Sequence, residues 1–216
     1  MFHTLFATWM NLTHAWGLPG VFLMMAIEST VFPLPSELVV PPAAYWAHQD
    51  GRPLAPLVVV AALGSWFGSA ISYAVARAIG RPLILRYGRY VFVPEKKWEL
   101  AELWIHHFSV VGVFFARLLP VVRHLVSLPA GVARMRFPAF TATTLAGSLL
   151  WSAVLAWFGE RVLGGEPRLL QDPDALLRVL KLKLLWFVGA AALLLALYVT
   201  VDLIGRRLHA RRHPAA

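Results

Sequence analysis

The stretch that decides the fold is residues 20–44, GVFLMMAIESTVFPLPSELVVPPAA, an apolar segment that carries two carboxylates and is interrupted by prolines. A second stretch echoes it over residues 112–131, GVFFARLLPVVRHLVSLPAG, with two guanidiniums in place of the carboxylates. Charges inside apolar segments of membrane length are rare and mark sites of transport or binding. Duplicated, broken segments are typical of membrane transporters. The pair therefore predicts a membrane transport site built from two related parts.

The composition is that of an integral membrane protein. Of the 216 residues, 59% are hydrophobic and 14% are charged, and the mean hydropathy is +0.65. Soluble domains average roughly 45–50% apolar and about 25% charged residues. The net charge of +9 comes from basic residues that flank apolar spans, which favours a role in membrane topology over nucleic-acid binding. The chain has no cysteine, which excludes disulfides, thiolate metal sites and cysteine nucleophiles.

Three segments are apolar over the roughly 20 residues that a helix needs to cross a bilayer. We expect them to be transmembrane helices, at residues 54–79, 138–158 and 184–205. Residues 1–17 lack the basic start of a secretory signal, and we interpret them as a short interfacial helix. Residues 90–108 carry apolar side chains at helical spacing, which predicts an amphipathic helix at the membrane surface. A helix that binds a soluble partner is the alternative for that segment.

Residues 18–47 and 109–131 are long and apolar, yet each contains two charges and residues that break helices. Proline removes a backbone donor and clashes with the preceding turn of a helix. Broken backbone at membrane depth is tolerated only where protein or water covers it. We therefore expect two re-entrant helical hairpins, with breaks at Pro33, Pro35, Pro120 and Gly131. A kinked helix that crosses the whole membrane is the alternative for both segments.

Basic residues predict how these segments are oriented, because they accumulate on the cytoplasmic side of membrane spans. They are concentrated between residues 77 and 97 and again between 206 and 212, which places both regions and the C-terminus inside. The two hairpins then enter the membrane from opposite faces. The helices that follow them share the pattern G-S-x-x-x-S-A, at residues 64–70 and 147–153. The predicted fold is an all-α membrane protein with an inverted repeat of two re-entrant helical hairpins, each followed by a transmembrane helix. A C-terminal transmembrane helix and an interfacial amphipathic helix complete it.

Four charged side chains lie inside the predicted hairpins: Glu28, Glu37, Arg117 and Arg123. A charge at mid-bilayer costs between about 2.5 and more than 10 kcal/mol unless it finds a partner or water. The glutamates and arginines can compensate one another across the two hairpins. The arginines offer forked donors suited to phosphate, and buried carboxylates can exchange protons. We expect a proton-coupled site for an anionic lipid headgroup. An ion-pair network without a further role is the alternative.

The remaining polar and aromatic residues receive structural interpretations. Arg77 lies near the end of a predicted helix, where it can snorkel towards the membrane surface. Tyr73 and the tryptophans fit interfacial belts and packing. No enzyme motif stands out, since the sequence contains no H-E-x-x-H, no G-x-S-x-G and no P-loop. We expect no enzyme activity, no cofactor and no metal site.

Three motifs follow one another along the chain. They are Glu28-x4-Pro33-x-Pro35-x-Glu37, Gly64-x3-Gly68-x4-Tyr73-x3-Arg77-x2-Gly80-Arg81, and Phe115-x-Arg117-x2-Pro120-x2-Arg123 followed by Pro129-Ala130-Gly131. Together they resemble the DedA family, which shares the VTT, or SNARE-associated, domain. The resemblance covers residues 18–160 and places the family's essential acidic pair on Glu28 and Glu37 and its arginine pair on Arg117 and Arg123. The second acid is often aspartate in relatives, and many of them carry an acidic residue where this chain has Ser69.

The resemblance implies a function and a location. It implies a bacterial inner-membrane protein whose transport domain, residues 18–160, moves a phosphate-bearing lipid by a proton-coupled flippase mechanism. Undecaprenyl phosphate is the candidate lipid. The expected partners are a membrane phospholipid or a polyprenyl phosphate, together with protons; no nucleic acid is expected, and a homo-oligomer is compatible with the sequence. The alternatives are a passive phospholipid scramblase and a membrane assembly or chaperone protein with structural charged hairpins.

Overall fold

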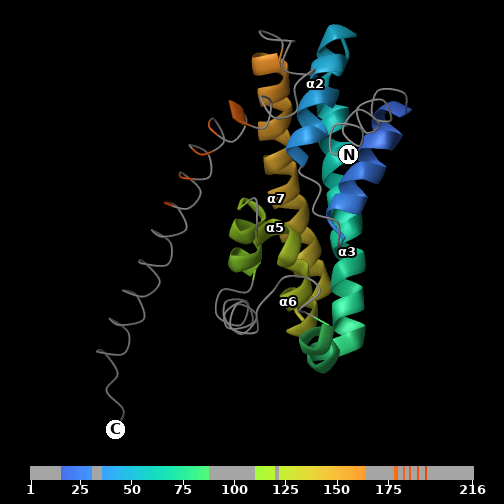
Figure 1. The fold of residues 1–216 in the computed structure, drawn as a ribbon, viewed down its shortest axis with the longest axis vertical. Coiled ribbons are helices and arrows are strands. Elements are labelled where there is room, and N and C mark those ends of the chain that lie inside the picture. Colours follow the sequence, from blue (N-terminus) through green and yellow to red (C-terminus); the bar gives the residue numbers. More distant parts are fainter. Residues whose placement is uncertain are drawn as a thin grey trace.

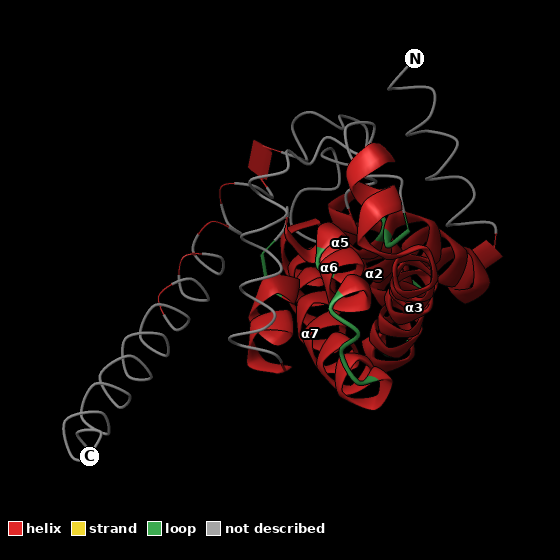
Figure 2. Ribbon diagram, turned by 90° about the horizontal axis from the view of Figure 1, so that it is seen from below, coloured by secondary structure: helices red, strands yellow, loops and turns green. Residues whose placement is uncertain are grey.

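The computed structural model describes residues 16–30, 36–87, 110–119 and 122–163, with isolated positions between 178 and 193. Every regular element in these ranges is helical, and Figure 2 shows the helices packed side by side without a strand among them. The all-α prediction is therefore confirmed for this part of the chain. Other predicted features lie outside the described residues: most of the 1–17 helix, the 90–108 helix, most of 184–205, and the breaks at Pro33, Pro35 and Pro120.

Two long helices form the centre of the molecule (Figure 1). Helix α3 spans Leu54–Tyr87, and helix α7 spans Phe137–Phe158 and passes into the π-helical turn η3 at Gly159–Leu163. Their contacts run in opposite order along the two helices, since Tyr73 stacks on Phe140 whereas Ser65 bonds to Ser148. The two helices are therefore antiparallel.

Both long helices have the length and composition of membrane spans, over Leu54–Ala78 and Phe137–Arg161. They agree with the spans predicted at 54–79 and 138–158. Helix α3 continues to Tyr87, beyond its predicted end. Charged residues end an apolar window in the sequence, but they do not interrupt the backbone hydrogen bonds that define the helix.

The first broken segment forms two arms that precede α3. Its first arm is the helix Trp16–Glu28, and its second arm is α2 (Val40–Gln49), which follows the 3-10 turn η1 (Ser36–Leu38). Proline stands in the first turn of α2, where the backbone donors have no partner within the helix and none is lost. The chain reverses at Gly51, whose φ of 66° suits a residue without a side chain, and enters α3. We call residues 16–87 the first half.

The second broken segment repeats this order before α7. Its first arm is the helical segment 110–117. Two short helices follow, α5 (Val122–Leu125) and α6 (Ser127–Val132), of which α6 is the second arm. The chain then turns through Arg134, which has a φ of 52°, and enters α7. We call residues 110–163 the second half.

Each first arm packs against the long helix of its own half. A Cβ added at Gly64 of α3 would collide with the carbonyl oxygen of Phe22, and one added at Gly147 of α7 would meet Arg117 and approach the carbonyl oxygen of Phe114. Small residues permit this close approach of helices. The two glycines hold the same place in the G-S-x-x-x-S-A motifs, and the two phenylalanines hold the same place in the echoing stretches. The halves therefore share their internal contact.

Each second arm packs against the long helix of the other half. Gly131 of α6 lies against the backbone of Tyr73 and the side chain of Ala76 on α3. Gly159, at the end of α7, lies against the backbone of Pro41 on α2. The two halves are interlocked, because neither broken segment has all its contacts within its own half.

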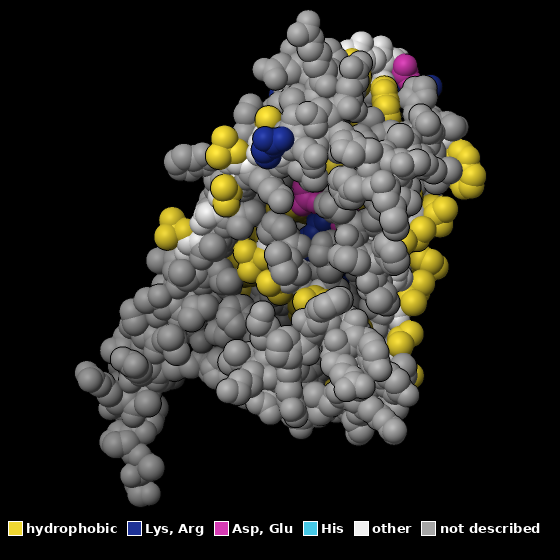
Figure 3. All heavy atoms as spheres, in the orientation of Figure 1, with side chains coloured by type: hydrophobic (Ala, Val, Ile, Leu, Met, Phe, Trp, Pro, Cys, Tyr) yellow, Lys and Arg dark blue, Asp and Glu magenta, His cyan; other side chains and the backbone are white. Residues whose placement is uncertain are grey.

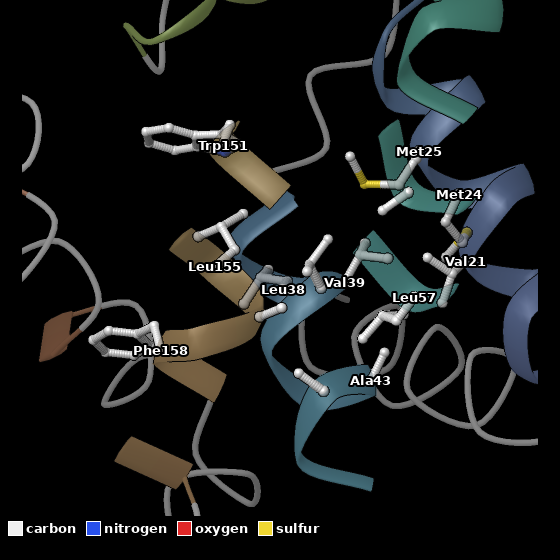
Figure 4. Packing of buried hydrophobic residues seen from close by; sticks show 14 residues of the cluster. Val21, Met24, Met25, Leu38, Val39, Ala43, Leu57, Trp151, Leu155 and Phe158 are labelled. Atoms are coloured by element: carbon white, nitrogen blue, oxygen red, sulfur yellow. The ribbon is translucent and has the colours of Figure 1, made fainter. Parts of the chain in front are cut away.

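Two apolar clusters hold the arms and the long helices together. The larger one joins the helix Trp16–Glu28, η1, α2, α3 and α7, and Figure 4 shows Met25, Leu38, Leu57 and Leu155 among its members. The smaller one surrounds Tyr73 and joins α3 to the second half. Glu28 lies four and three residues after the buried Met24 and Met25, and Arg117 follows the buried Ala116 directly. The clusters therefore fix the backbone on which these charged side chains sit.

Candidate functional site

The centre of the site is an ion pair between the two halves. Glu28, at the end of the first arm, accepts a hydrogen bond from Nη2 of Arg123 on α5. The two residues are 2% and 7% exposed, so the pair is shielded from solvent. The backbone N–H of Ser36 on η1 donates to the same carboxylate oxygen over 3.0 Å. The end of one helix, a turn and a helix from the other half thus meet at one carboxylate.

Ser36 and Trp151 surround the guanidinium of Arg123. The Ser36 hydroxyl accepts a hydrogen bond from Nη2 of Arg123 and a second one, of 3.3 Å, from the indole Nε1 of Trp151. The guanidinium carbon of Arg123 lies 5.1 Å from the centre of the Trp151 ring, within the range of a cation–π contact. Arg123 therefore has a carboxylate, a hydroxyl and an aromatic ring around it.

Arg117 is buried in a different way. It is 3% exposed, its Nη2 donates to the hydroxyl of Ser127 over 2.8 Å, and its guanidinium lies 5.9 Å from the centre of the Phe140 ring. Its Nε has no hydrogen-bond partner among the described residues, and neither Glu28 nor Glu37 forms an ion pair with it. Within the part of the chain that the structure describes, this positive charge has no acidic partner in contact.

Both arginines face a small cavity. Its volume is about 10 Å³, roughly the space of one water molecule. Seven residues line it: Met25, Ser65, Arg117, Arg123, Ser148, Trp151 and Ser152. Figure 3 shows acidic and basic atoms next to each other in a recess in the middle of one face, between apolar side chains. The arginines therefore share a polar space that is too small, in this conformation, for a phosphate group.

Buried hydroxyls connect the two long helices beside the cavity. Ser65 bonds to Ser29 over 2.9 Å and to Ser148 over 3.3 Å. Ser65 and Ser148 hold equivalent places in the two G-S-x-x-x-S-A motifs, as do Ser69 and Ser152, and the hydroxyls of this second pair are buried without a hydrogen-bond partner among the described residues. Ser65 and Ser148, at equivalent positions of the two motifs, therefore meet at the contact between the halves.

The other predicted site residues that the structure describes, Glu37 and Gly131, neither line the cavity nor take part in the ion pair. Glu37 is on η1, is only partly buried and forms no ion pair with Arg117 or Arg123 among the described residues. Gly131 is not a break, which corrects the prediction. It lies inside α6, where the missing side chain admits the backbone of α3, and the chain turns only after Val132. Of the predicted residues, the structure thus joins Glu28 to Arg123 and places Arg117 at the same cavity.

Three side chains that contact the site were not predicted from the sequence. Ser36 and Trp151 hold Arg123, and Ser127 holds Arg117. The signal for Trp151 was its place in the second motif, where the first motif has Gly68. A bulky side chain that replaces glycine in one of two related motifs indicates that the space is used differently there.

Tyr73 also has a more specific place than a packing residue. Its hydroxyl donates to the carbonyl oxygen of Met135, in the turn before α7, and accepts a hydrogen bond of 2.6 Å from Nη1 of Arg77. Its ring stacks on Phe140, with the ring centres 4.6 Å apart. Arg77 therefore joins a contact between the halves in addition to any contact with lipid.

Residues 34–161 match the VTT domain. The chain belongs to the VTT domain family. The resemblance to DedA proteins that the sequence motifs predicted is thereby confirmed. The matched range contains Glu37, both arginines and both long helices, and it begins after Glu28.

Curated relatives cover about two thirds of the chain. Undecaprenyl phosphate transporter A of Bacillus subtilis is 29% identical over 143 residues, which are 66% of this chain and 70% of the relative. The protein of the same name from Staphylococcus aureus is 28% identical over 148 residues, 67% of this chain and 73% of its own. An alkaline phosphatase-like protein of Lactococcus lactis subsp. cremoris is 30% identical over 148 residues, 66% and 69% of the two chains. No solved structure matches the chain.

Proposed function

We propose that this protein is a transporter of the bacterial inner membrane that moves a phosphate-bearing lipid, with undecaprenyl phosphate as the candidate. The observation that carries the proposal is Arg117, a buried guanidinium without an ion-pair partner among the described residues. A charge inside a membrane protein is costly unless it is paired or meets water. An anion that enters the site would supply the missing negative charge.

The chemistry of the site favours a phosphate. Arginine presents planar, forked donors that match phosphate oxygens, and charge-assisted hydrogen bonds to an anion are stronger than neutral ones. Arg117 has a free Nε donor, and Arg123 lines the same cavity. The printed names of the Bacillus subtilis and Staphylococcus aureus relatives support undecaprenyl phosphate as the lipid.

The path for the lipid would be formed by two re-entrant hairpins related by an inverted repeat. The antiparallel long helices, the equivalent contacts at Gly64 and Gly147, and the exchange of second arms between the halves support this arrangement. The cavity is too small for a phosphate, so transport requires the arms to separate. Movement of one broken segment relative to the other is a common basis of alternating access.

Glu28 would couple transport to protons. A phosphate that binds Arg123 competes with Glu28 for the same guanidinium. A buried carboxylate that loses its cationic partner is stabilised by taking up a proton. Binding of the phosphate and protonation of Glu28 would therefore occur together. Glu37, which is partly exposed on the adjacent turn, would exchange that proton with water.

The substitution Arg117→Met tests the proposal. Methionine is the residue at the equivalent position of the first half, Met25, and fits a buried site. We expect transport of undecaprenyl phosphate in proteoliposomes to fall about a hundredfold, as the loss of a charge-assisted hydrogen bond of about 3 kcal/mol implies. Thermal stability should not fall, because an apolar residue in place of a buried charge is often neutral or stabilising.

The exposed Arg161 provides the control, since Arg161→Met removes the same charge at a surface position.

Transport by wild-type protein of phosphatidylethanolamine, but not of undecaprenyl phosphate, would contradict the proposed lipid. Transport that ignores a pH gradient in wild-type and Glu28→Gln proteins would favour a passive scramblase. If purified protein moves no lipid, and the same variants lose association with other membrane proteins, an assembly role would replace transport.

A further inference from the structure

Trp151 is fully buried beside the charged site, with an exposed fraction of 1%. Its ring faces the guanidinium of Arg123, and its Nε1 donates to the hydroxyl of Ser36. The same hydroxyl accepts a hydrogen bond from Arg123. Trp151 therefore contacts Arg123 both directly and through Ser36, and neither contact involves Glu28.

Such contacts would matter for the transport step proposed above. Under the proposed function, Arg123 gives up Glu28 when it binds the lipid phosphate, because the two anions compete for the single positive charge of its guanidinium. A guanidinium has five N–H groups on a flexible stem, and holding it in one orientation costs side-chain entropy. Contacts that persist during the exchange would keep the fork aimed at the cavity.

The two arginines differ in where these contacts come from. Arg117 lies between Ser127 of α6 and Phe140 of α7, both in its own half. Arg123 lies between Trp151 of its own half and Ser36 of the first half. Each arginine thus has one serine and one aromatic ring, but only the pair around Arg123 spans the boundary between the halves.

We propose that Trp151 and Ser36 are positioning residues that hold Arg123 while its partner changes from Glu28 to the phosphate of the lipid. The inference rests on the proposed function. It assigns to Trp151 a role that packing alone does not give, namely control of the affinity for the phosphate group. Because Ser36 belongs to the first half, the orientation of Arg123 depends on how the two halves are placed.

The test uses the full chain in proteoliposomes with undecaprenyl phosphate at varied concentration. Trp151→Leu removes the ring and the donor, whereas Trp151→Phe keeps a ring and removes the donor. We expect the apparent KM to rise about tenfold in Trp151→Leu and less in Trp151→Phe, as loss of a buried cation–π contact implies, while the maximal rate changes less than about twofold. Ser36→Ala should raise KM, and Ser36→Thr, which restores a hydroxyl, should recover it.

Trp66 supplies a matched control. Its Nε1 donates to the hydroxyl of Thr141 over 3.2 Å, so Trp66→Phe removes an indole-to-hydroxyl hydrogen bond of similar length, here between α3 and α7, that does not involve Arg123. Its KM should stay at the wild-type value. Ser36→Ala and Trp151→Phe keep the test valid if Trp151→Leu does not fold.

Two results would overturn the inference. If wild-type protein transports the lipid and the Trp151 and Ser36 variants keep the wild-type KM, with only stability or maximal rate reduced, both residues are structural. In that case the proposed function stands. If wild-type protein transports no phosphate-bearing lipid, the proposed function fails and this inference fails with it.

Discussion

The two halves of the molecule share the contacts that hold them together and differ in the residues that fill the site. Gly64 and Gly147 admit the first arm at equivalent places on the two long helices. One turn further along, the first half has Gly68, which packs tightly against the carbonyl of Ala26, and the second half has Trp151, which lines the cavity. The repeated glycines therefore serve close packing, whereas Trp151, which has no bulky counterpart in the first half, lines the cavity.

The charges follow the same division. Met25 of the first half and Arg117 of the second half are equivalent in the echoing stretches, and both line the cavity. Glu28 comes from the first half and Arg123 from the second. Each half therefore supplies what the other lacks, and the site exists only where the halves meet.

The largest expected effect concerns the ion pair that joins the halves. Glu28→Leu or Arg123→Leu alone should destabilise the protein by about 3–5 kcal/mol, because each removes the ion-pair partner of a buried charge. The double variant should recover much of that loss, since apolar residues can replace a buried ion pair. Unfolding of all four proteins in the same detergent gives the coupling energy as a double-mutant cycle. Additive losses in the double variant would show that the two side chains act independently.

Much of this site could be predicted from the sequence, and the reasons differ from residue to residue. Glu28 and Arg123 were predictable because a charge in an apolar segment must find a partner, and each lies in one of the two echoing stretches. Trp151 and Ser36 were not, because their contact depends on how closely α7 approaches η1, which no local pattern encodes. The same limit applies to Glu37, whose position is set by the geometry of the turn and not by its spacing from Glu28.

Part of the fold could also be predicted from the sequence, and part could not. Apolar length predicted the two long helices, and the shared G-S-x-x-x-S-A pattern predicted that they are related. The exchange of second arms was not predictable, since Gly131 is equally compatible with a break and with close packing. Only the neighbouring backbone of Tyr73 decides between the two.

The next prediction asks whether the equivalent contacts at Gly64 and Gly147 contribute equally to thermal stability. Gly64→Val and Gly147→Val each place a branched side chain against the first arm, where even a Cβ would collide. Overpacking of this kind costs about 1–3 kcal/mol, and equivalent positions should give similar losses of thermal stability. Gly189→Val is the control, because no residue that the structure describes lies within 4 Å of a Cβ at that position. Clearly unequal losses at Gly64 and Gly147 would show that the halves do not share one packing scheme.

The smallest expected effect concerns the contact that Tyr73 makes between the two halves. Tyr73→Phe keeps the ring that stacks on Phe140 and removes the hydroxyl that bonds to the Met135 carbonyl and to Arg77. A net hydrogen bond contributes about 1 kcal/mol, so the melting temperature should fall by a few degrees. Tyr45→Phe provides the control, since Tyr45 is a partly buried tyrosine of the larger cluster. Tyr73 joins α3 to the turn before α7 and does not bond to Arg117 or Arg123. The KM for the lipid should therefore stay unchanged. A raised KM with unchanged stability would instead place Tyr73 in the transport site and extend that site beyond the cavity.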